Sequence, residues 1–167
     1  MKTGSSIAIS VILIQCLISC SDRCEPETFL IPEGYHGQVM IVYNQKKGKP
    51  KKYEGSRRVY EIPENGILFT AFPNEEGIID QEYYFITDSG KRKKICGNEI
   101  FYDQKSNEQK DAVSIYHPAQ VGNYPDYYGR GEVHFQQFFV GKPSEMDSVY
   151  LPKNNEKFHA PLNSVNM

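Results

Sequence analysis

The chain has 167 residues, a formal net charge of −2 and four cysteines. A charge this close to neutral gives no sign of a nucleic-acid partner, and the length suffices for one domain with a substantial core. Tyr (12) and Phe (9) favour strands, so the composition indicates β structure.

The first segment has the layout of a secretory signal. Lys2 precedes an apolar run over residues 7–18, which polar residues end well short of the about 20 apolar residues that a membrane-spanning helix needs. We therefore expect residues 1–19 to be a signal peptide that is cleaved.

The junction Leu17-Ile18-Ser19-Cys20 resembles the lipobox of bacterial lipoproteins. The resemblance implies that Cys20 carries acyl chains such as palmitate and becomes the first residue of the mature protein. More than one such chain anchors a protein stably to a membrane. In enterobacterial lipoproteins an aspartate after the cysteine retains the protein at the inner membrane, so the resemblance implies that Ser21 favours the outer membrane of the cell envelope. The alternative is an ordinary secretory signal with a cysteine near its cleavage site by chance.

After a spacer at residues 20–27, the apolar pattern predicts a domain over residues 28–151. Strands are expected at residues 28–31, 37–43, 57–62, 67–72, 81–87, 112–116 and 133–141, with an edge at 149–151. Asn65-Gly66 predicts a hairpin between two of them. Residues 97–111 fit a short helix or irregular chain, residues 118–131 a loop, and residues 152–167 a flexible tail.

Strand 37–43 has apolar residues on both faces, with Val39, Ile41 and Tyr43 on one and Met40 and Val42 on the other. Such a pattern is typical of a central strand. The strands together predict an all-β fold, an antiparallel β-sandwich or a partly open barrel.

Residues 29–35 (FLIPEGY), 37–39 and 58–68 (RVYEIPENGIL) resemble the core of bacterial lipoprotein domains of unknown function. Phe138-Phe139-Val140-Gly141 is similar to the closing strand of that family. The resemblance implies a family and a compartment but no activity. The strand order is more distantly similar to transthyretin-like and Ig-like sandwiches.

Two cysteines remain after Cys20. Cys24 and Cys96 predict either a disulfide or two buried thiols, since exported chains face an oxidising compartment. They lack the paired spacing of a structural zinc site. We expect no metal and no cofactor.

The sequence carries no motif for a nucleophile elbow, a phosphate loop or a zinc protease. Asp80 with Glu82, or Asp126 with Glu132, is a possible acid–base pair, but 21 acidic residues produce such pairs by chance. The chain is therefore expected not to be an enzyme.

Two surface features remain. More than half of the cations lie at residues 46–58 and 91–94, and the candidate contacts among them are Lys46, Lys47, Lys49, Lys51 and Lys52. They either bind an anionic ligand or only keep strand edges soluble. In a simple meander the two basic clusters lie at opposite ends of the sheet.

The second feature is a Gly- and Tyr-rich stretch with Tyr124, Tyr127, Tyr128 and Arg130. Its tyrosines either stack on sugars or a protein partner, or fold inward to cap the sandwich.

The preferred interpretation is a lipid-anchored, non-catalytic binding or scaffolding module of the bacterial envelope, with an envelope protein or glycan as partner and no nucleic acid. The alternatives are a glycan- or anionic-ligand-binding lipoprotein and, third, an envelope hydrolase.

Overall fold

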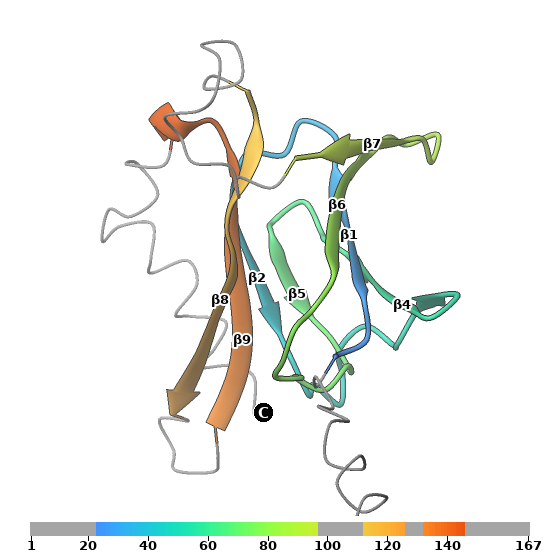
Figure 1. Cartoon of the computed structure of the whole chain (residues 1–167), viewed down its shortest axis with the longest axis vertical. Helices are drawn as coiled ribbons and strands as arrows, with labels where there is room; N and C mark the ends of the chain where they lie inside the picture. The colour runs from blue at the N-terminus through green and yellow to red at the C-terminus, as the bar shows by residue number, and fades with distance from the viewer. Residues whose placement is uncertain (1–22, 97–111, 126–131, 146–167) are drawn as a thin grey trace, which may run out of the picture.

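The computed structural model describes residues 23–96, 112–125 and 132–145, which form two sheets packed face to face (Figure 1). The strand orders are β3-β4-β1-β6-β7 and β5-β2-β9-β8. The strands are β1 Glu27–Pro32, β2 Gly37–Val42, β3 Tyr53–Glu54, β4 Arg57–Glu61, β5 Ile67–Phe69, β6 Gln81–Ile86, β7 Arg92–Ile95, β8 Ser114–Pro125 and β9 Glu132–Gly141. The predicted all-β sandwich is confirmed.

Several predicted features lie outside the described residues. These are the signal peptide at 1–19, Cys20, the segment 97–111, the edge at 149–151 and the tail at 152–167. Within the described ranges, no helix has the length and apolar character to cross a membrane.

The strand pairing is mixed, whereas the sequence predicted antiparallel strands. β1 is parallel to both β4 and β6, and β2 is parallel to β5. The reason is that the chain alternates between the two sheets. It runs along one sheet, returns along the other, and then enters the first sheet again in its original direction. Strands that follow each other within one sheet, such as β6 and β7 or β8 and β9, are antiparallel.

The predicted hairpin at Asn65-Gly66 is wrong for the same reason. Gly66 has a positive φ of 77°, and the Asn65 side chain accepts a hydrogen bond from the Ile67 amide at 3.1 Å, so the turn forms as its residues require. However, β4 is already paired with β3 and β1, and the turn carries the chain across to β5 in the other sheet.

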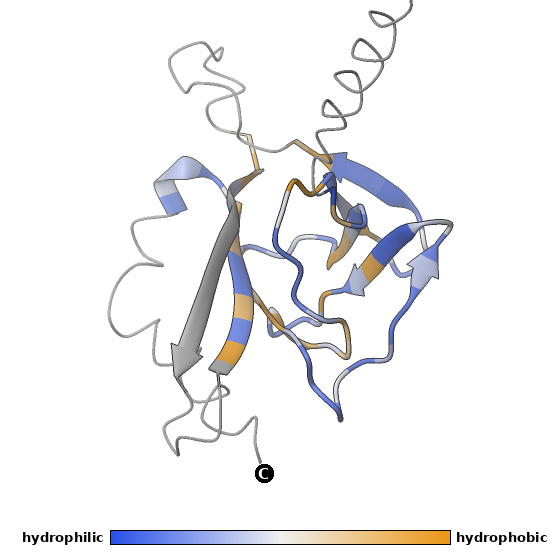
Figure 2. Cartoon of the chain, turned by 60° about the horizontal axis from the view of Figure 1, so that its bottom comes forward, coloured by the Kyte–Doolittle hydropathy of each residue, from blue (hydrophilic) through white to orange (hydrophobic). Residues whose placement is uncertain are grey.

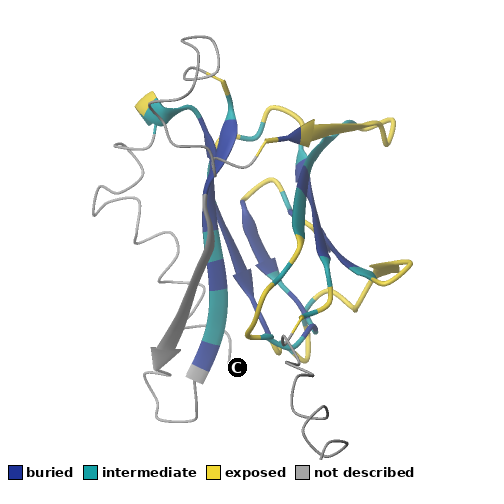
Figure 3. Cartoon of the chain, viewed as in Figure 1, coloured by how far each residue is buried: buried dark blue, intermediate teal, exposed yellow. Residues whose placement is uncertain are grey.

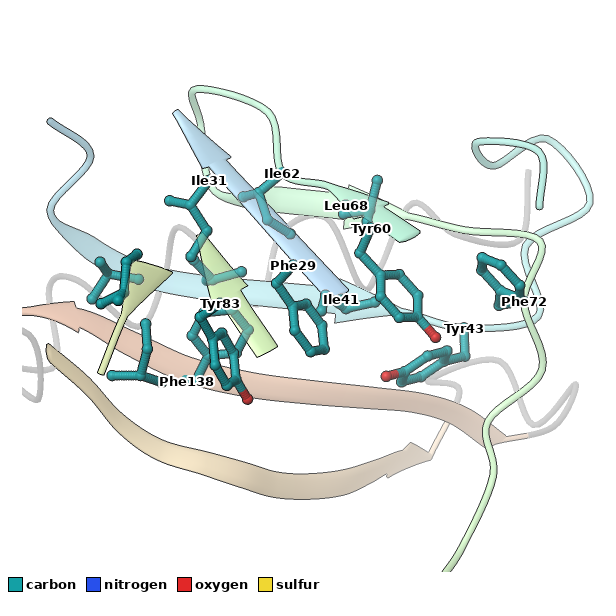
Figure 4. Close-up of a cluster of buried hydrophobic side chains, with 14 residues drawn as sticks. Phe29, Ile31, Ile41, Tyr43, Tyr60, Ile62, Leu68, Phe72, Tyr83 and Phe138 are labelled. Atoms are coloured by element: carbon teal, nitrogen blue, oxygen red, sulfur yellow. The ribbon is translucent and has the colours of Figure 1, made fainter. Parts of the chain in front are cut away.

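The core between the sheets is built on aromatic rings (Figure 4). The Phe29 ring stacks on those of Tyr60 and Tyr83, with centroids 5.0 and 4.8 Å away, and meets the edge of Phe138 at 5.4 Å. Each ring pair of this kind contributes about 0.5–1.5 kcal/mol beyond the area it buries. Three strands of one sheet and β9 of the other are thereby joined through one side chain.

The predicted two-faced pattern of β2 is confirmed. Val39, Ile41 and Tyr43 point into the main core, while Met40 and Val42 belong to a second apolar cluster on the outer face of the same sheet. β2 lies between β5 and β9, the central place that its pattern predicts.

The predicted loop over residues 118–131 is wrong for its first half, since β8 continues to Pro125. The pairing register shifts between Tyr116 and Gln120, on either side of Pro118. β8 is an edge strand, where a proline, which has no amide hydrogen, is tolerated at an irregularity.

The two ends of the sandwich carry most of the exposed residues (Figure 3). We call the end formed by residues 23–26, 44–51 and 70–80 the N-terminal end. The ring centroid of Tyr43, which follows β2, lies 6.3 Å from that of Tyr60 in β4. The Tyr60 hydroxyl donates a hydrogen bond to Glu27 at the start of β1, so both sheets contribute to this end. The distal end holds the turns at residues 33–36, 63–66 and 87–91.

Candidate functional site

The predicted basic loop lies at the N-terminal end, where β2 leads into β3 (Figure 1). It is tied to the segment after β5 by hydrogen bonds from the Lys49 amide to the Phe69 carbonyl at 2.8 Å and from the Ala71 amide to the Lys49 carbonyl at 2.9 Å. A Cβ on Gly48 would lie 2.8 Å from the Thr70 nitrogen, so this close approach requires glycine. The loop backbone is therefore held in place.

All five lysines of the loop are exposed: Lys46, Lys47, Lys49, Lys51 and Lys52. In Figure 2, which brings this end forward, the described loops here are largely hydrophilic. Lys52 differs from the others because its Nζ lies 2.5 Å from the Glu61 carboxylate, on the outer face of the five-stranded sheet. Lys52 is thus paired within the domain, whereas Lys46, Lys49 and Lys51 form no ion pair with any described residue.

The second predicted basic cluster lies on the turn after β6 and on β7. Lys91 and Lys93 lie towards the distal end, whereas Arg92 and Lys94 bind carboxylates on the outer face of the five-stranded sheet. Lys91 lies in the turn before β7, and Lys93 is an exposed residue of that strand. Arg92 is bound by Glu54 through two hydrogen bonds of 2.7 and 2.5 Å, and Lys94 is bound by Glu82 at 2.9 Å. The two basic clusters therefore do not form one patch.

The described part of the tyrosine stretch, Tyr124, lies near the N-terminal end as well. Tyr124 is part of β8 and pairs with Val133 of β9, and the two strands terminate at Pro125 and Glu132 on the side where β2 also ends. Tyr127, Tyr128 and Arg130 lie outside the described residues.

A buried arginine organises the same end. The Arg58 side chain is 2% exposed, and its Nε donates to Glu25 at 2.6 Å while Nη1 donates to the Pro73 carbonyl at 2.9 Å. Nη2 donates to Glu75, and the guanidinium carbon lies 5.0 Å from the centroid of the Phe72 ring. The hydrogen bond from Arg58 holds the pKa of Glu25 below its ordinary value.

Residues assigned to the spacer therefore belong to the domain. Arg23 forms a bridge with Ile78, Glu25 binds Arg58, and β1 begins at Glu27. The physical reason is that a buried guanidinium needs carboxylates, and the chain before β1 supplies one of them. The sequence held a signal for this, since strand alternation places Arg58 on the same face as the core residues Tyr60 and Ile62.

Glu27 is a buried carboxyl group next to this cluster, with 3% of its surface exposed. It accepts hydrogen bonds from the Tyr60 hydroxyl at 2.9 Å and from Gln81 Nε2 at 2.8 Å. Burial raises the pKa of Glu27. Its two neighbours both donate to it, which is the arrangement of a structural carboxyl group in a network.

The candidate acid–base pair Asp80 and Glu82 is bound by one arginine. Arg57 Nη1 lies 2.6 Å from Asp80, and its Nη2 lies 3.6 Å from Glu82. The side chains of the second pair, Asp126 and Glu132, lie outside the described residues. Among the side chains that the structure describes, no group of three or more His, Cys, Asp or Glu residues is placed to hold a metal ion.

The structure does not join Cys24 to Cys96. Cys24 precedes β1, and Cys96 follows β7, with β6 between those strands. Cys96 is an exposed, free thiol. The predicted disulfide is therefore absent, because strand order separates the two positions by more than the about 7 Å between Cα atoms that a bridge allows.

Comparison with known proteins places the fold. The structure is similar to that of a candidate lipoprotein from Bacillus anthracis, with a TM-score of 0.60 over 84% of this chain and 94% of that chain. The sequence identity is 18%, so the likeness concerns the fold. No curated protein matched the chain.

The sequence matches the family of unknown function DUF6843 over residues 23–141. The match begins at the residue where the described domain begins and ends with β9. It spans well over half of the chain and confirms the resemblance to a family of unknown function. The protein belongs to the DUF6843 family.

Proposed function

We propose that the protein is a lipid-anchored, non-catalytic binding or scaffolding module of the bacterial cell envelope. The observation that carries the proposal is Cys20, which ends a sequence like a lipobox only three residues before the first residue of the fold, Arg23. The similar fold of a Bacillus anthracis protein described as a candidate lipoprotein supports it. Ser21 favours the outer membrane.

A non-catalytic role is supported by how the acidic groups are used. Glu25 and Asp80 each bind an arginine of the domain, and Glu27 is occupied by two donors. These carboxyl groups stabilise the N-terminal end instead of facing a substrate.

Metabolic labelling with an alkyne-tagged palmitate analogue tests the anchor. The wild-type protein and a Cys16→Ala variant should both incorporate the label, whereas Cys20→Ala should not. Cys16 is the matched control because it is the other cysteine before the domain. Label on Cys20→Ala, or none on the wild type, would contradict the proposal.

A second candidate is a module that binds a glycan or an anionic ligand. It is favoured by one observation, that the basic loop and the ends of β8 and β9 lie at the same end of the sandwich. Salt should weaken binding through the lysines, whereas competition by free sugars would indicate the tyrosines.

A further inference from the structure

The N-terminal end displays cations that lack ion-pair partners in the domain. Lys46, Lys49 and Lys51 form no ion pair with any residue in the described ranges, in contrast to Lys52 and Arg57, which are bound by Glu61 and Asp80. The three lysines are exposed on a loop whose backbone is fixed to residues 69–71. The loop backbone is thus fixed, and no described carboxylate lies within ion-pair distance of these three ammonium groups. Arg58 and, more weakly, Lys51 lower the pKa of Glu25.

These cations lie close to the point where the domain meets its proposed anchor. The loop pairs with Thr70 through Lys49, and the segment that follows Thr70 reaches Ile78, which bridges the exposed Arg23. Phe72 and Pro73, midway along this segment, contact Arg58, which also binds Glu25. One continuous set of contacts therefore connects the basic loop with the first residues of the fold.

The tether that joins this end to the bilayer is very short. From Cys20 to Arg23 the chain has three residues, which span at most about 10 Å when fully extended. Charges act over a comparable distance, about 8 Å, at physiological ionic strength. An anchor on Cys20 thus brings the N-terminal end within reach of the membrane's own charges.

We propose that Lys46, Lys49 and Lys51, together with Arg23, bind the anionic phospholipid headgroups of the membrane that holds Cys20. The inference rests on the proposed lipid anchor. Headgroup phosphates are the partner that the geometry favours, because the tether keeps them at high local concentration beside this end. The contact orients the domain with its distal end, including Lys91 and Lys93, away from the bilayer.

The test uses the full lipidated protein, purified from membranes and reconstituted in vesicles of phosphatidylcholine, alone or with phosphatidylglycerol. An amine-acylating reagent labels exposed lysines, and peptide mass spectrometry measures the extent at each site. In vesicles with phosphatidylglycerol, labelling of Lys46, Lys49 and Lys51 should fall about fivefold or more, the factor expected for one cation near an anionic surface. Labelling of Lys91 and Lys93 should not change, and high salt should abolish the difference.

Charge-matched variants sharpen the test. Lys46→Gln with Lys49→Gln should return labelling of Lys51 most of the way to its level in pure phosphatidylcholine. Lys91→Gln with Lys93→Gln removes the same charge from the distal end and should leave Lys51 protected. All four lysines are exposed and without ion pairs in the described ranges, so the urea midpoints of both variants should equal that of the wild type.

The anchor and the headgroup contact fail in different ways. If the protein does not float with vesicles at high salt, the anchor is wrong and the inference falls with it. If it floats but its lysines label equally in both kinds of vesicle, the headgroup contact is wrong while the anchor stands. If Lys51 is protected equally in pure phosphatidylcholine, its protection does not depend on anionic headgroups, and this result also overturns the inference.

Discussion

Replacing Arg58 with Met tests whether residues 23–26 are part of the folded domain, on which the short tether depends. Met keeps the unbranched apolar stem and removes the guanidinium group. In the wild type this group makes three hydrogen bonds, to Glu25, Glu75 and the Pro73 carbonyl. The variant therefore disconnects the chain before β1 from β4.

The expected loss follows from the exposure of the partners. A hydrogen bond to a charged group contributes about 1.5–3 kcal/mol, and breaking a fully buried ion pair costs about 3–5 kcal/mol. The Glu25 and Glu75 side chains are 44% and 34% exposed, so water replaces much of their bonding once Arg58 is gone. We expect the free energy of unfolding to fall by about 2–3 kcal/mol.

Lys52→Met is the control. The Lys52 and Glu61 side chains are 51% and 48% exposed, so the loss of their ion pair should cost about 1 kcal/mol or less. Urea unfolding followed by circular dichroism measures both, and limited proteolysis shows whether residues 23–26 become accessible in Arg58→Met. If Arg58→Met is no less stable than Lys52→Met, or if its N-terminal segment resists protease as well as that of the wild type does, Arg58 does not hold residues 23–26 to the domain.

Three further predictions concern single positions. Gly66→Ala should lower the free energy of unfolding in urea more than Gly34→Ala does. Both glycines have a φ near +77°, which costs an alanine about 1 kcal/mol, but only at Gly66 would the new Cβ lie 2.7 Å from the Gln38 carbonyl oxygen. Equal losses would contradict this close approach. Burial raises the pKa of Glu27, so the folded state holds the carboxyl proton more tightly than the unfolded state, and the contribution of Glu27 to stability falls as the pH rises above the ordinary pKa of 4.5. Urea unfolding at a series of pH values should therefore show Glu27→Gln gaining stability relative to the wild type as the pH rises. A difference between the two proteins that does not change with pH would disprove this. Cys96 should react with a maleimide in native protein prepared without reductant, whereas a mass showing that thiol bridged would contradict the structure.

Much of the fold could be predicted because buried and exposed positions alternate along a strand, which gives the sequence a regular apolar pattern. β2 shows both of its apolar faces in the sequence. β9 alternates in the same way, with Phe138 in the main core and Phe135 against the outer cluster. The parallel pairing could not be predicted from such patterns. A strand that crosses to the other sheet and one that turns back beside its predecessor have the same alternation, and Asn65-Gly66 suits either connection.

The candidate site was predicted in part. The lysines of the basic loop could be singled out by composition alone, but their position at the N-terminal end depends on contacts between distant segments, such as Lys49 with Thr70 and Arg23 with Ile78. The role of Arg58 was missed, although strand alternation placed it in the core. Pro118 misled the interpretation of β8, because a proline on an edge strand and a proline in a loop look alike in sequence.

The mass of the N-terminal peptide, measured on protein extracted from its native membrane, tests the lipid anchor most directly. A lipid-anchored chain begins at Cys20 and carries a diacylglyceryl group on the thiol, with the amine acylated as well. A mature chain that begins elsewhere, or an unmodified Cys20, would contradict it.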